Sequence, residues 1–518
     1  MVPLYFESAT SLALKIRRGE ITSEELTLLF IQRIEQFDAS INAVVVRCFE
    51  EAIMRAKELD GVFAKDGSTI GPLHGVPITV KENNDVKGLA TMVGDPTKKD
   101  APVAYSNSPL VQRLLDAGAV ILGKTNLPIG CNDVQTYNTV YGTTSNPYDL
   151  SRTPGGSSGG SAAALCAGLT ALELGGDIGG SIRVPAACCG IFGHKSTLSA
   201  IPFSYGPTRS HDIVVKGPLS RSSEDLELAM KLLAHIEGPA KRALTIKLPC
   251  NEKKKHLKDF RVAIWYDDAV CPVDSDILTA LKKLVINLNV LGCTHVVEGA
   301  KPFDEKYGWK GGSAKAFRIY KCLLATEENL TMTPEEAQAL LDTITTNTTY
   351  EKRKQIEWIT QSAQSWHRAN IERQNMRMAY ERFFEEFDVL VCPICVSVAW
   401  PKDESGSGSH EWEEQKRSQK QRDECDVVQH FWQVGNRSIP GADGHKTPYH
   451  DQVFWSGVTN ICGNPSTVFP AGRAAKSKTN MPVGLQVVGS EWNDLTTIAF
   501  VKALEKEGGY SFVPPKGY

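Results

Sequence analysis

The chain has 518 residues, a formal net charge of −3 and an aromatic content of 8%. This near-neutral balance, without a long block of one sign, disfavours nucleic acid or an anionic membrane as the main partner, so we expect a small-molecule ligand. The odd count of 13 cysteines, scattered through apolar surroundings, fits free thiols in a reducing compartment, and we expect a cytoplasmic protein. The start of the sequence lacks a secretory leader pattern and no run of about 18 apolar residues occurs, so we predict no membrane span.

The first part of the chain, to about residue 70, predicts amphipathic helices. Thr22 and Glu25 have the spacing of a capping box, and apolar residues follow at helical spacing. A turn-rich segment, Gly71–Pro77, leads into the short apolar strand Ile78–Val80, which ends at Lys81. Lysine is rarely buried without a partner, so Lys81 is a surface residue unless another part of the chain provides one.

Residues 118–125 spell Gly-x-x-x-x-Gly-Lys-Thr, which is the pattern of a phosphate-binding loop. The segment before it predicts a helix, Leu110–Ala117. The predicted strand Ala119–Leu122 lies between the two glycines instead of before them, and Pro128 follows the expected turn Gly123–Asn126, so the loop cannot lead directly into a helix. A P-loop NTPase is therefore the less favoured alternative.

The remainder of the chain alternates predicted strands and helices, which indicates an α/β protein. The expected strands are Phe260–Trp265, Val389–Val391 and Met481–Gly489, and the expected helices include 226–233, Ile277–Leu291, most of Pro334–Phe387 and a closing helix.

Two groups of cysteine or histidine need a separate interpretation. Cys392 and Cys395 form a CxxC pair, but without a second pair or a thioredoxin-like context they indicate small buried residues rather than a redox or metal site. The polar stretch of about 402–452 is expected to be a surface insertion with solvent-exposed histidines rather than a zinc site. These histidines are His410, His430, His445 and His450. We therefore expect no metal and no organic cofactor.

Two clusters of glycine and serine, residues 155–161 and 175–183, bracket an apolar run of helix length. Such glycines let backbone N–H groups approach a ligand closely, so we place the chemistry here. One interpretation is the nucleophile elbow of α/β-hydrolases with Ser158 as nucleophile, but the polar loop Asp149–Pro154 stands where an elbow needs a strand. A purely structural turn is less favoured for two clusters than for one.

With Lys81 and Asn83, these clusters resemble the amidase signature family, whose enzymes hydrolyse amide bonds with a Ser–Ser–Lys triad. The resemblance runs nearly position by position from Gly155 to Thr197 and extends over most of the chain. It implies an α/β/α fold in which helices cover both faces of a large mixed β-sheet. The implied organisation is a single domain over 1–518, with N-terminal helices to about 70, a signature core at about 71–235 and a remainder that contains the insertion.

The resemblance also implies a role for individual residues. Ser181 would be the nucleophile, Ser157 the bridging serine, and Lys81 the base, which burial must keep neutral. The bridging serine would follow a cis peptide bond, Gly156–Ser157. The implied oxyanion hole consists of the backbone N–H groups of Ile178, Gly179, Gly180 and Ser181. Supporting structural roles fall to Ser158, Asp177 and Arg183, and the substrate pocket would include Cys131 and Asn132.

The chain departs from the family pattern at His194, which replaces an apolar residue, and at Ser196, which replaces a proline. Some family members belong to a glutamine-dependent tRNA amidotransferase, as its A subunit, and continue with Tyr-Gly-Arg-Val-Ser. This chain reads Leu198–Pro202 instead, which favours a stand-alone amidase. The expected reaction is hydrolysis of the C–N bond of a small-molecule amide, or of a related carbamate or ester, and a homodimer is compatible with the sequence.

Overall fold

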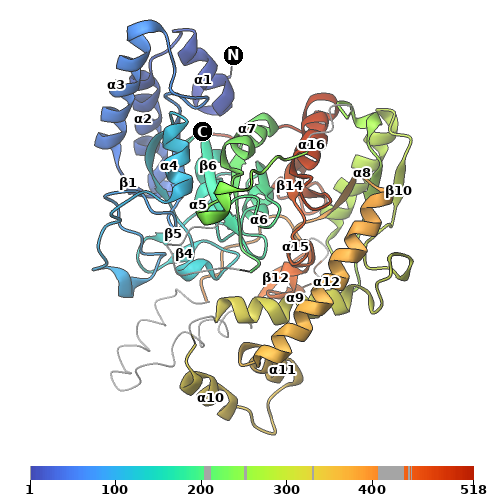
Figure 1. The fold of residues 1–518 in the computed structure, drawn as a ribbon. Coiled ribbons are helices and arrows are strands. Elements are labelled where there is room, and N and C mark those ends of the chain that lie inside the picture. The colour runs from blue at the N-terminus through green and yellow to red at the C-terminus, as the bar shows by residue number, and fades with distance from the viewer. Residues whose placement is uncertain are drawn as a thin grey trace.

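The computed structural model describes residues 2–202, 212–249, 254–329, 332–405, 437–441, 444 and 446–518. Its centre is a mixed sheet of 11 strands (Figure 1). In sheet order the strands are β1 (Val44–Arg47), β3 (Val120–Thr125), β2 (Pro77–Lys81), β6 (Leu172–Asp177), β8 (Val215–Ser220), β7 (Phe192–Lys195), β14 (Ser466–Arg473), β15 (Pro482–Val488), β11 (Val389–Pro393), β9 (Val262–Ile264) and β10 (Val296–Glu298). Short hairpins are formed by β4 (Tyr137–Asn138) with β5 (Gly142–Thr143) and by β12 (Ser438–Pro440) with β13 (Lys446–Pro448).

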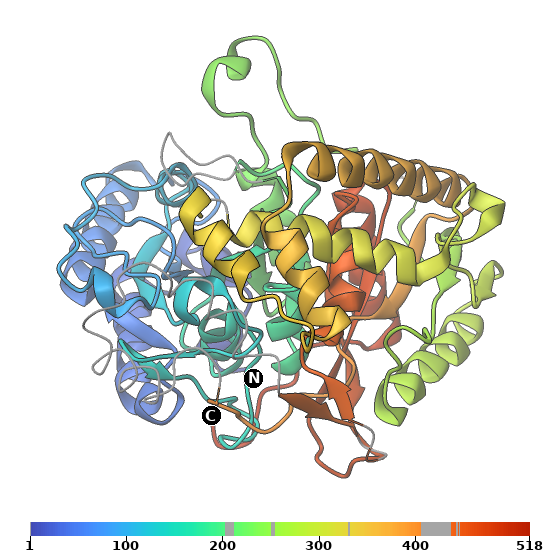
Figure 2. The same ribbon diagram turned by 90° about the horizontal axis from the view of Figure 1, so that it is seen from below.

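Helices cover this sheet in an α/β/α arrangement, as expected (Figures 1 and 2). They are α1 (Ala9–Arg17), α2 (Ser23–Ile41), α3 (Phe49–Asp66), α4 (Pro109–Asp116), α5 (Gly159–Cys166), α6 (Arg183–Cys188), α7 (Ser223–Leu233), α8 (Ser275–Val290), α9 (Gly312–Glu328), α10 (Pro334–Asp342), α11 (Tyr350–Ile359), α12 (Ala363–Glu386), α15 (Phe454–Asn460) and α16 (Asp494–Gly508). None of the helices in the described part of the chain combines the length and the apolar character needed to cross a membrane.

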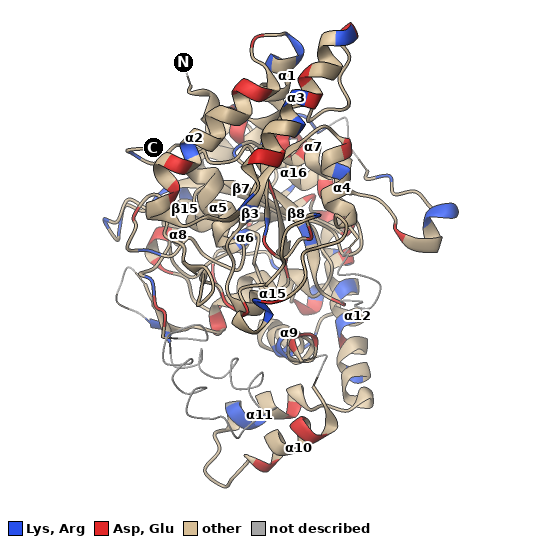
Figure 3. Cartoon of the chain, turned by 90° about the vertical axis from the view of Figure 1, so that its left-hand side faces the viewer, with Lys and Arg blue, Asp and Glu red and all other residues tan. Residues whose placement is uncertain are grey.

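One large apolar core holds the sheet and its helices together, and a small second cluster joins α9 to α10 and α11. Helices α10 and α11 extend below the main body in Figure 1. Charged residues gather on the peripheral helices, as the colouring of Figure 3 shows for α1, α3 and α10. The polar faces of the amphipathic helices thus face solvent, and their apolar faces build the core.

Most predicted elements are confirmed, including the capping box in which Thr22 accepts from the Glu25 amide at 3.1 Å. Two local predictions are wrong. The N-terminal helices are interrupted by β1, and the turn expected at 123–126 is not formed because β3 continues through Thr125. The first residues of the second glycine cluster belong to β6. Since Lys124 and Thr125 lie within a buried strand, residues 118–125 do not form a phosphate-binding loop.

Only the ends of the polar stretch 402–452 are described, and several of their side chains are buried, Arg437, Tyr449 and Gln452 among them. Arg437 forms an ion pair with the buried Asp133 at 2.7 Å, so this end of the stretch is part of the protein interior rather than a surface insertion. His410, His430 and His445 lie outside the described residues.

Candidate active site

The predicted site lies where two parallel strands end. β2 ends at Lys81 and its parallel neighbour β6 ends at Asp177, so both side chains lie at the same edge of the sheet. Ser157 lies just before α5, and Ser181 lies between β6 and α6. The carboxyl ends of neighbouring parallel strands are the common place for a ligand site in α/β proteins.

Lys81 has the buried partner that its position requires. Its Nζ lies 2.6 Å from Ser157 Oγ, and each residue is only 1% exposed. Burial lowers the pKa of Lys81 below its ordinary value, because an ammonium group loses its hydration in the interior. The peptide bond between Gly156 and Ser157 is cis, which confirms the expectation from the family resemblance.

A cavity of about 450 Å³ opens beside this pair. Its walls include Lys81, Ser157, Ser181, Cys131, Asn132 and Ile178, so it brings together the predicted triad and the predicted pocket residues. A smaller cavity of about 70 Å³ adjoins it and is also lined by Ser181. No hydrogen bond joins Ser157 to Ser181 within the described part of the chain, although the Ser158 N–H donates to the Ser181 carbonyl at 3.1 Å.

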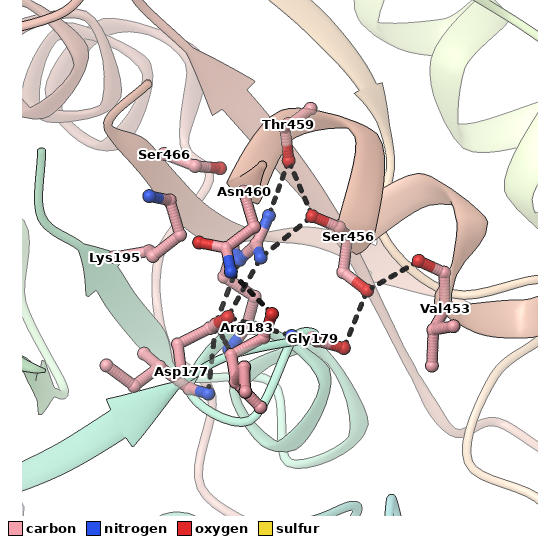
Figure 4. Close-up of polar contacts among 12 residues, drawn as sticks. Asp177, Gly179, Arg183, Lys195, Val453, Ser456, Thr459, Asn460 and Ser466 are labelled. Carbon is pink, nitrogen blue, oxygen red and sulfur yellow. Dashed lines mark hydrogen bonds and ion pairs between the residues drawn. The ribbon is translucent and has the colours of Figure 1, made fainter. Parts of the chain in front are cut away.

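Asp177 and Arg183 form a fully buried ion pair behind the site (Figure 4). Arg183 Nε and Nη2 each lie 2.9 Å from a carboxylate oxygen of Asp177. Burial alone would raise the pKa of Asp177, but the charge and hydrogen bonds of Arg183 outweigh it, and the pKa is lowered. Arg183 also donates to Thr459, Gln486 and the Ser456 carbonyl, which ties this loop to α15 and β15.

The loop 178–181 is held by side chains that the sequence analysis missed. Tyr320 and Asn460 both donate to its first carbonyl, that of Ile178, and the distance from Tyr320 is 3.3 Å. Ser456 donates to the next carbonyl at 2.7 Å (Figure 4). These residues come from α9 and α15, and each lies in a helix whose sequence gives no local sign of a catalytic contact.

The same contacts orient the backbone amides. A peptide unit is planar and trans, so fixing the Ile178 carbonyl turns the Gly179 N–H to the opposite side. The Gly180 N–H donates to Asp177 Oδ1 at 2.8 Å and is therefore already used within the loop. Of the four predicted oxyanion donors, this leaves the amides of Ile178, Gly179 and Ser181 as candidates.

Ser158 and Cys131 differ in what surrounds them. The Ser158 hydroxyl is buried and has no hydrogen-bond partner among the described residues, so only its backbone joins the two turns. Cys131 adopts a left-handed backbone conformation with φ of 66°, and its Sγ accepts from the Asn83 amide at 3.5 Å. Cys131 lines both cavities.

The two departures from the family pattern have structural partners. His194 is buried between Thr467 and Asp494, at 2.9 and 3.1 Å from its ring nitrogens. The Ser196 hydroxyl donates to the carbonyl of Lys216 at 2.8 Å. Both residues therefore stabilise packing behind the site.

Lys216 itself was not predicted. It lies on β8, is buried, and its Nζ donates to Asn84 Oδ1 at 2.9 Å, while the Asn84 amide donates to the Lys81 carbonyl at 2.9 Å. Burial first, and then the neighbouring Lys81 charge, lowers the pKa of Lys216 to about 7. Two lysines with lowered pKa values thus lie close together at this end of the sheet.

His450 is the one histidine of the polar stretch that the structure describes. It is half-buried and lines the smaller cavity, so it is not the exposed loop residue that we expected. Burial lowers its pKa to about 4, which keeps its imidazole neutral at ordinary pH.

The amidase family model matches residues 25–498 of the chain. The chain belongs to the amidase signature family. Over 98% of its length it is 28% identical to indoleacetamide hydrolase of Bradyrhizobium diazoefficiens, covering 87% of that protein. It is also 33% identical to the A subunit of glutamyl-tRNA(Gln) amidotransferase from Moorella thermoacetica, over 56% of this chain and 59% of the relative.

Among solved structures, a bacterial aryl acylamidase superposes with a TM-score of 0.76. The two chains are 24% identical, and the superposition covers 98% of this chain and 97% of the acylamidase. At that identity the likeness establishes the amidase signature fold alone. The family match makes the protein a hydrolase of amides, and its substrate is a separate question.

Proposed function

We propose that this amidase acts as a single chain on small-molecule amides, with carbamates and esters as related substrates, through an acyl-enzyme on Ser181. The observation that carries this proposal is the 2.6 Å hydrogen bond between Lys81 Nζ and Ser157 Oγ, beside the cavity that Ser181 also lines. A serine needs a base within reach to become a nucleophile, and a buried lysine is that base only when it is neutral.

In the proposed mechanism neutral Lys81 accepts the Ser157 hydroxyl proton while Ser157 accepts the proton of Ser181. Ser181 Oγ then forms a bond to the substrate carbonyl carbon. The required Ser157–Ser181 hydrogen bond is not formed among the described contacts, and catalytic hydrogen bonds of this kind commonly tighten when substrate binds. The substrate thus completes the proton path.

The negative charge that develops on the carbonyl oxygen is stabilised by backbone N–H groups of the loop 178–181. Each such donor contributes about 3 kcal/mol to the transition state in serine hydrolases. Ser157 then gives a proton to the leaving nitrogen as the C–N bond breaks and takes one back from protonated Lys81, which becomes neutral again. Water attacks the ester on Ser181, releases the acid and restores the free hydroxyl.

The test labels the full chain with a fluorophosphonate and identifies the modified residue by mass spectrometry. Ser181 is the expected site, and Ser181→Ala should abolish labelling and lower kcat on a simple anilide by at least about 10³-fold. Ser157→Ala and Lys81→Met should strongly lower both the labelling and kcat. Ser158→Ala should lower them far less, because the Ser158 hydroxyl has no partner among the described residues. Labelling at Ser158 instead would favour the nucleophile elbow and refute the proposal.

The same preparation separates a stand-alone amidase from one component of an amidotransferase. The stand-alone enzyme hydrolyses simple amides as a purified single chain. An amidotransferase component would show little activity until its partner protein is added. Activity of the single chain within the usual range of about 1–10³ s⁻¹ supports the first function.

A further inference from the structure

The carboxyl group of Glu328 lies in the cavity wall and has no part in the proposed mechanism. Glu328 ends α9, and it lines both the larger cavity and the smaller cavity beside it. Ser181 lines both cavities as well, so the carboxyl group and the nucleophile border the same space. A substrate bonded to Ser181 would therefore extend into the space that Glu328 borders.

This carboxyl group has no partner in the described protein. Its Oε2 atom is buried and accepts no hydrogen bond, and none of the ion pairs among the described residues includes it. Buried carboxylates normally have a cation or hydrogen-bond donors beside them, because an unpaired charge loses its hydration without compensation. Burial, followed by the negative charge of Glu327, raises the pKa of Glu328 to about 8.

The preceding residue, Glu327, adds negative charge beside Glu328. Glu327 also lines the larger cavity and accepts from the Asp212 amide at 2.7 Å. Neither lysine of the cavity wall forms an ion pair with Glu328 among the described residues: Lys81 donates to Ser157, and Lys98 lies 4.0 Å from Asp95. Among the described residues, Glu328 is therefore a carboxyl group in the cavity wall without a cation partner.

A purely apolar substrate would cover the Glu328 carboxyl group without providing a donor. A substrate with an ammonium group would instead supply both a positive charge and N–H donors. Ligand sites of this kind obtain their specificity from a few polar groups, since a group left unpaired disfavours the wrong ligand.

We propose that Glu328 is a specificity-determining residue that binds an ammonium group on the acyl part of the substrate, so that the preferred substrates are amino-substituted amides. This inference rests on the proposed function of Ser181. Cys131 and Asn132, which the family resemblance places in the acyl pocket, line both cavities together with Glu328.

The position of Glu328 along α9 also sets the expected distance between the ammonium group and the scissile carbonyl of the substrate. It lies eight residues after Tyr320, whose hydroxyl contacts the Ile178 carbonyl beside the site. A helix rises 1.5 Å per residue, so the two Cα atoms are about 12 Å apart along the axis. Long side chains on a helix lean toward its N-terminus, and this holds for Tyr320 and Glu328 alike, so the separation of their polar ends stays close to this value. The ammonium group is therefore expected several bonds away from the scissile carbonyl.

The experiment compares pairs of p-nitroanilides that differ only in an ω-ammonium or ω-methyl group, over spacers of increasing length. With the wild-type chain we expect kcat/KM to favour the amino member at least about tenfold at the best spacing. Glu328→Gln should remove this preference through KM while kcat on the methyl member changes less than about threefold, and Glu328→Leu should favour the methyl member. Glu335→Gln, at an exposed carboxylate on the neighbouring helix α10, is the matched control and should retain the preference.

The pH dependence supplies a readout that a structural role would not produce. In the wild type, KM for the amino member should fall as the pH rises from 6 to 8, because the carboxyl group becomes charged while the amine stays charged. In Glu328→Gln this trend should be absent.

A second measurement does not require turnover. An alkylammonium ion should slow fluorophosphonate labelling of Ser181 more than the corresponding alcohol, and Glu328→Gln should abolish the difference. Equal protection by the two, or equal kcat/KM for the paired anilides with Ser181 still labelled, would overturn the role of Glu328 alone. Failure of Ser181 to react at all would overturn the proposed function instead.

Discussion

Replacement of Arg183 by methionine tests the buried ion pair behind the loop 178–181. The substitution keeps an apolar side chain of similar length but removes two hydrogen bonds to Asp177, each of 2.9 Å. It also removes bonds of 2.7 Å to Thr459, 3.0 Å to Gln486 and 3.0 Å to the Ser456 carbonyl. Asp177 would then be a fully buried carboxylate without its cation.

Breaking a buried pair by removing one partner costs about 3–5 kcal/mol. The entropy of unfolding is about 2.1 cal/mol/K per residue, or roughly 1.1 kcal/mol/K for 518 residues, so the melting temperature should fall by about 3–5 °C. Calorimetry at pH 8 provides the measurement. The loss should be smaller at pH 5, because burial without Arg183 raises the pKa of Asp177 and protonation then removes the unpaired charge.

Arg377→Met is the matched control. Arg377 forms a two-bond pair with Glu491, but its side chain is 33% exposed, so the expected cost is about 1 kcal/mol or less. Arg183→Met should also lower kcat by more than tenfold. Arg183 holds Asp177, and Asp177 in turn holds the Gly180 amide and with it the conformation of the loop 178–181. Equal melting temperatures for the two variants, or a loss in Arg183→Met that does not depend on pH, would refute this account of the ion pair.

Three further predictions follow from other buried groups. The value of kcat/KM should rise with pH along a limb whose midpoint lies below 10.5, because burial lowers the pKa of Lys81 and only the neutral amine is a base. Lys216→Met should shift this limb to higher pH, since it removes a neighbouring positive charge, and an unchanged limb would contradict the coupling. Burial raises the pKa of Glu173 to about 7, so between pH 4.5 and 7 the folded state keeps a proton that the unfolded chain releases, and stability falls as pH rises. Glu173→Gln should therefore raise the free energy of unfolding, measured with urea, by about 3 kcal/mol at pH 8 and leave it unchanged at pH 4. An equal gain at both pH values would mean that the substitution acts through packing and not through the charge. Tyr320→Phe should lower kcat less than about tenfold, because Asn460 still holds the same carbonyl, and a greater loss would make Tyr320 the dominant anchor.

The motifs of the glycine-rich stretch could be recognised from the sequence because their geometry admits few other residues. A Cβ atom on Gly156 would lie 2.6 Å from the Gln135 carbonyl, and one on Gly160 would lie 2.4 Å from the Asn126 backbone nitrogen. Such close approaches restrict these positions to glycine, so the local pattern itself carries structural information. The capping box at Thr22 and the apolar strand before Lys81 are local in the same sense.

The residues that complete the site could not be found this way. Tyr320 and Asn460 reach the loop 178–181 from 142 and 282 residues away along the chain, and in sequence they are ordinary helical residues. Lys216 lies in a fully buried strand, where hydrophobic periodicity predicts an exposed lysine. Only the packing of α9, α15 and β8 against the site assigns these side chains a role.

This division separates the proposed catalytic residues from the proposed specificity residue. Lys81, Ser157 and Ser181 come from segments joined to β2, α5 and β6, whereas Glu328 and His450 come from parts of the chain that follow the glycine-rich stretch by well over a hundred residues. The first set is constrained by glycine geometry and by the need for a neutral lysine. The second set only has to fill the cavity and can change its charge without altering the serine turns. A change of substrate within this fold should therefore be sought first at the end of α9, where a single carboxyl group stands unpaired among the described residues.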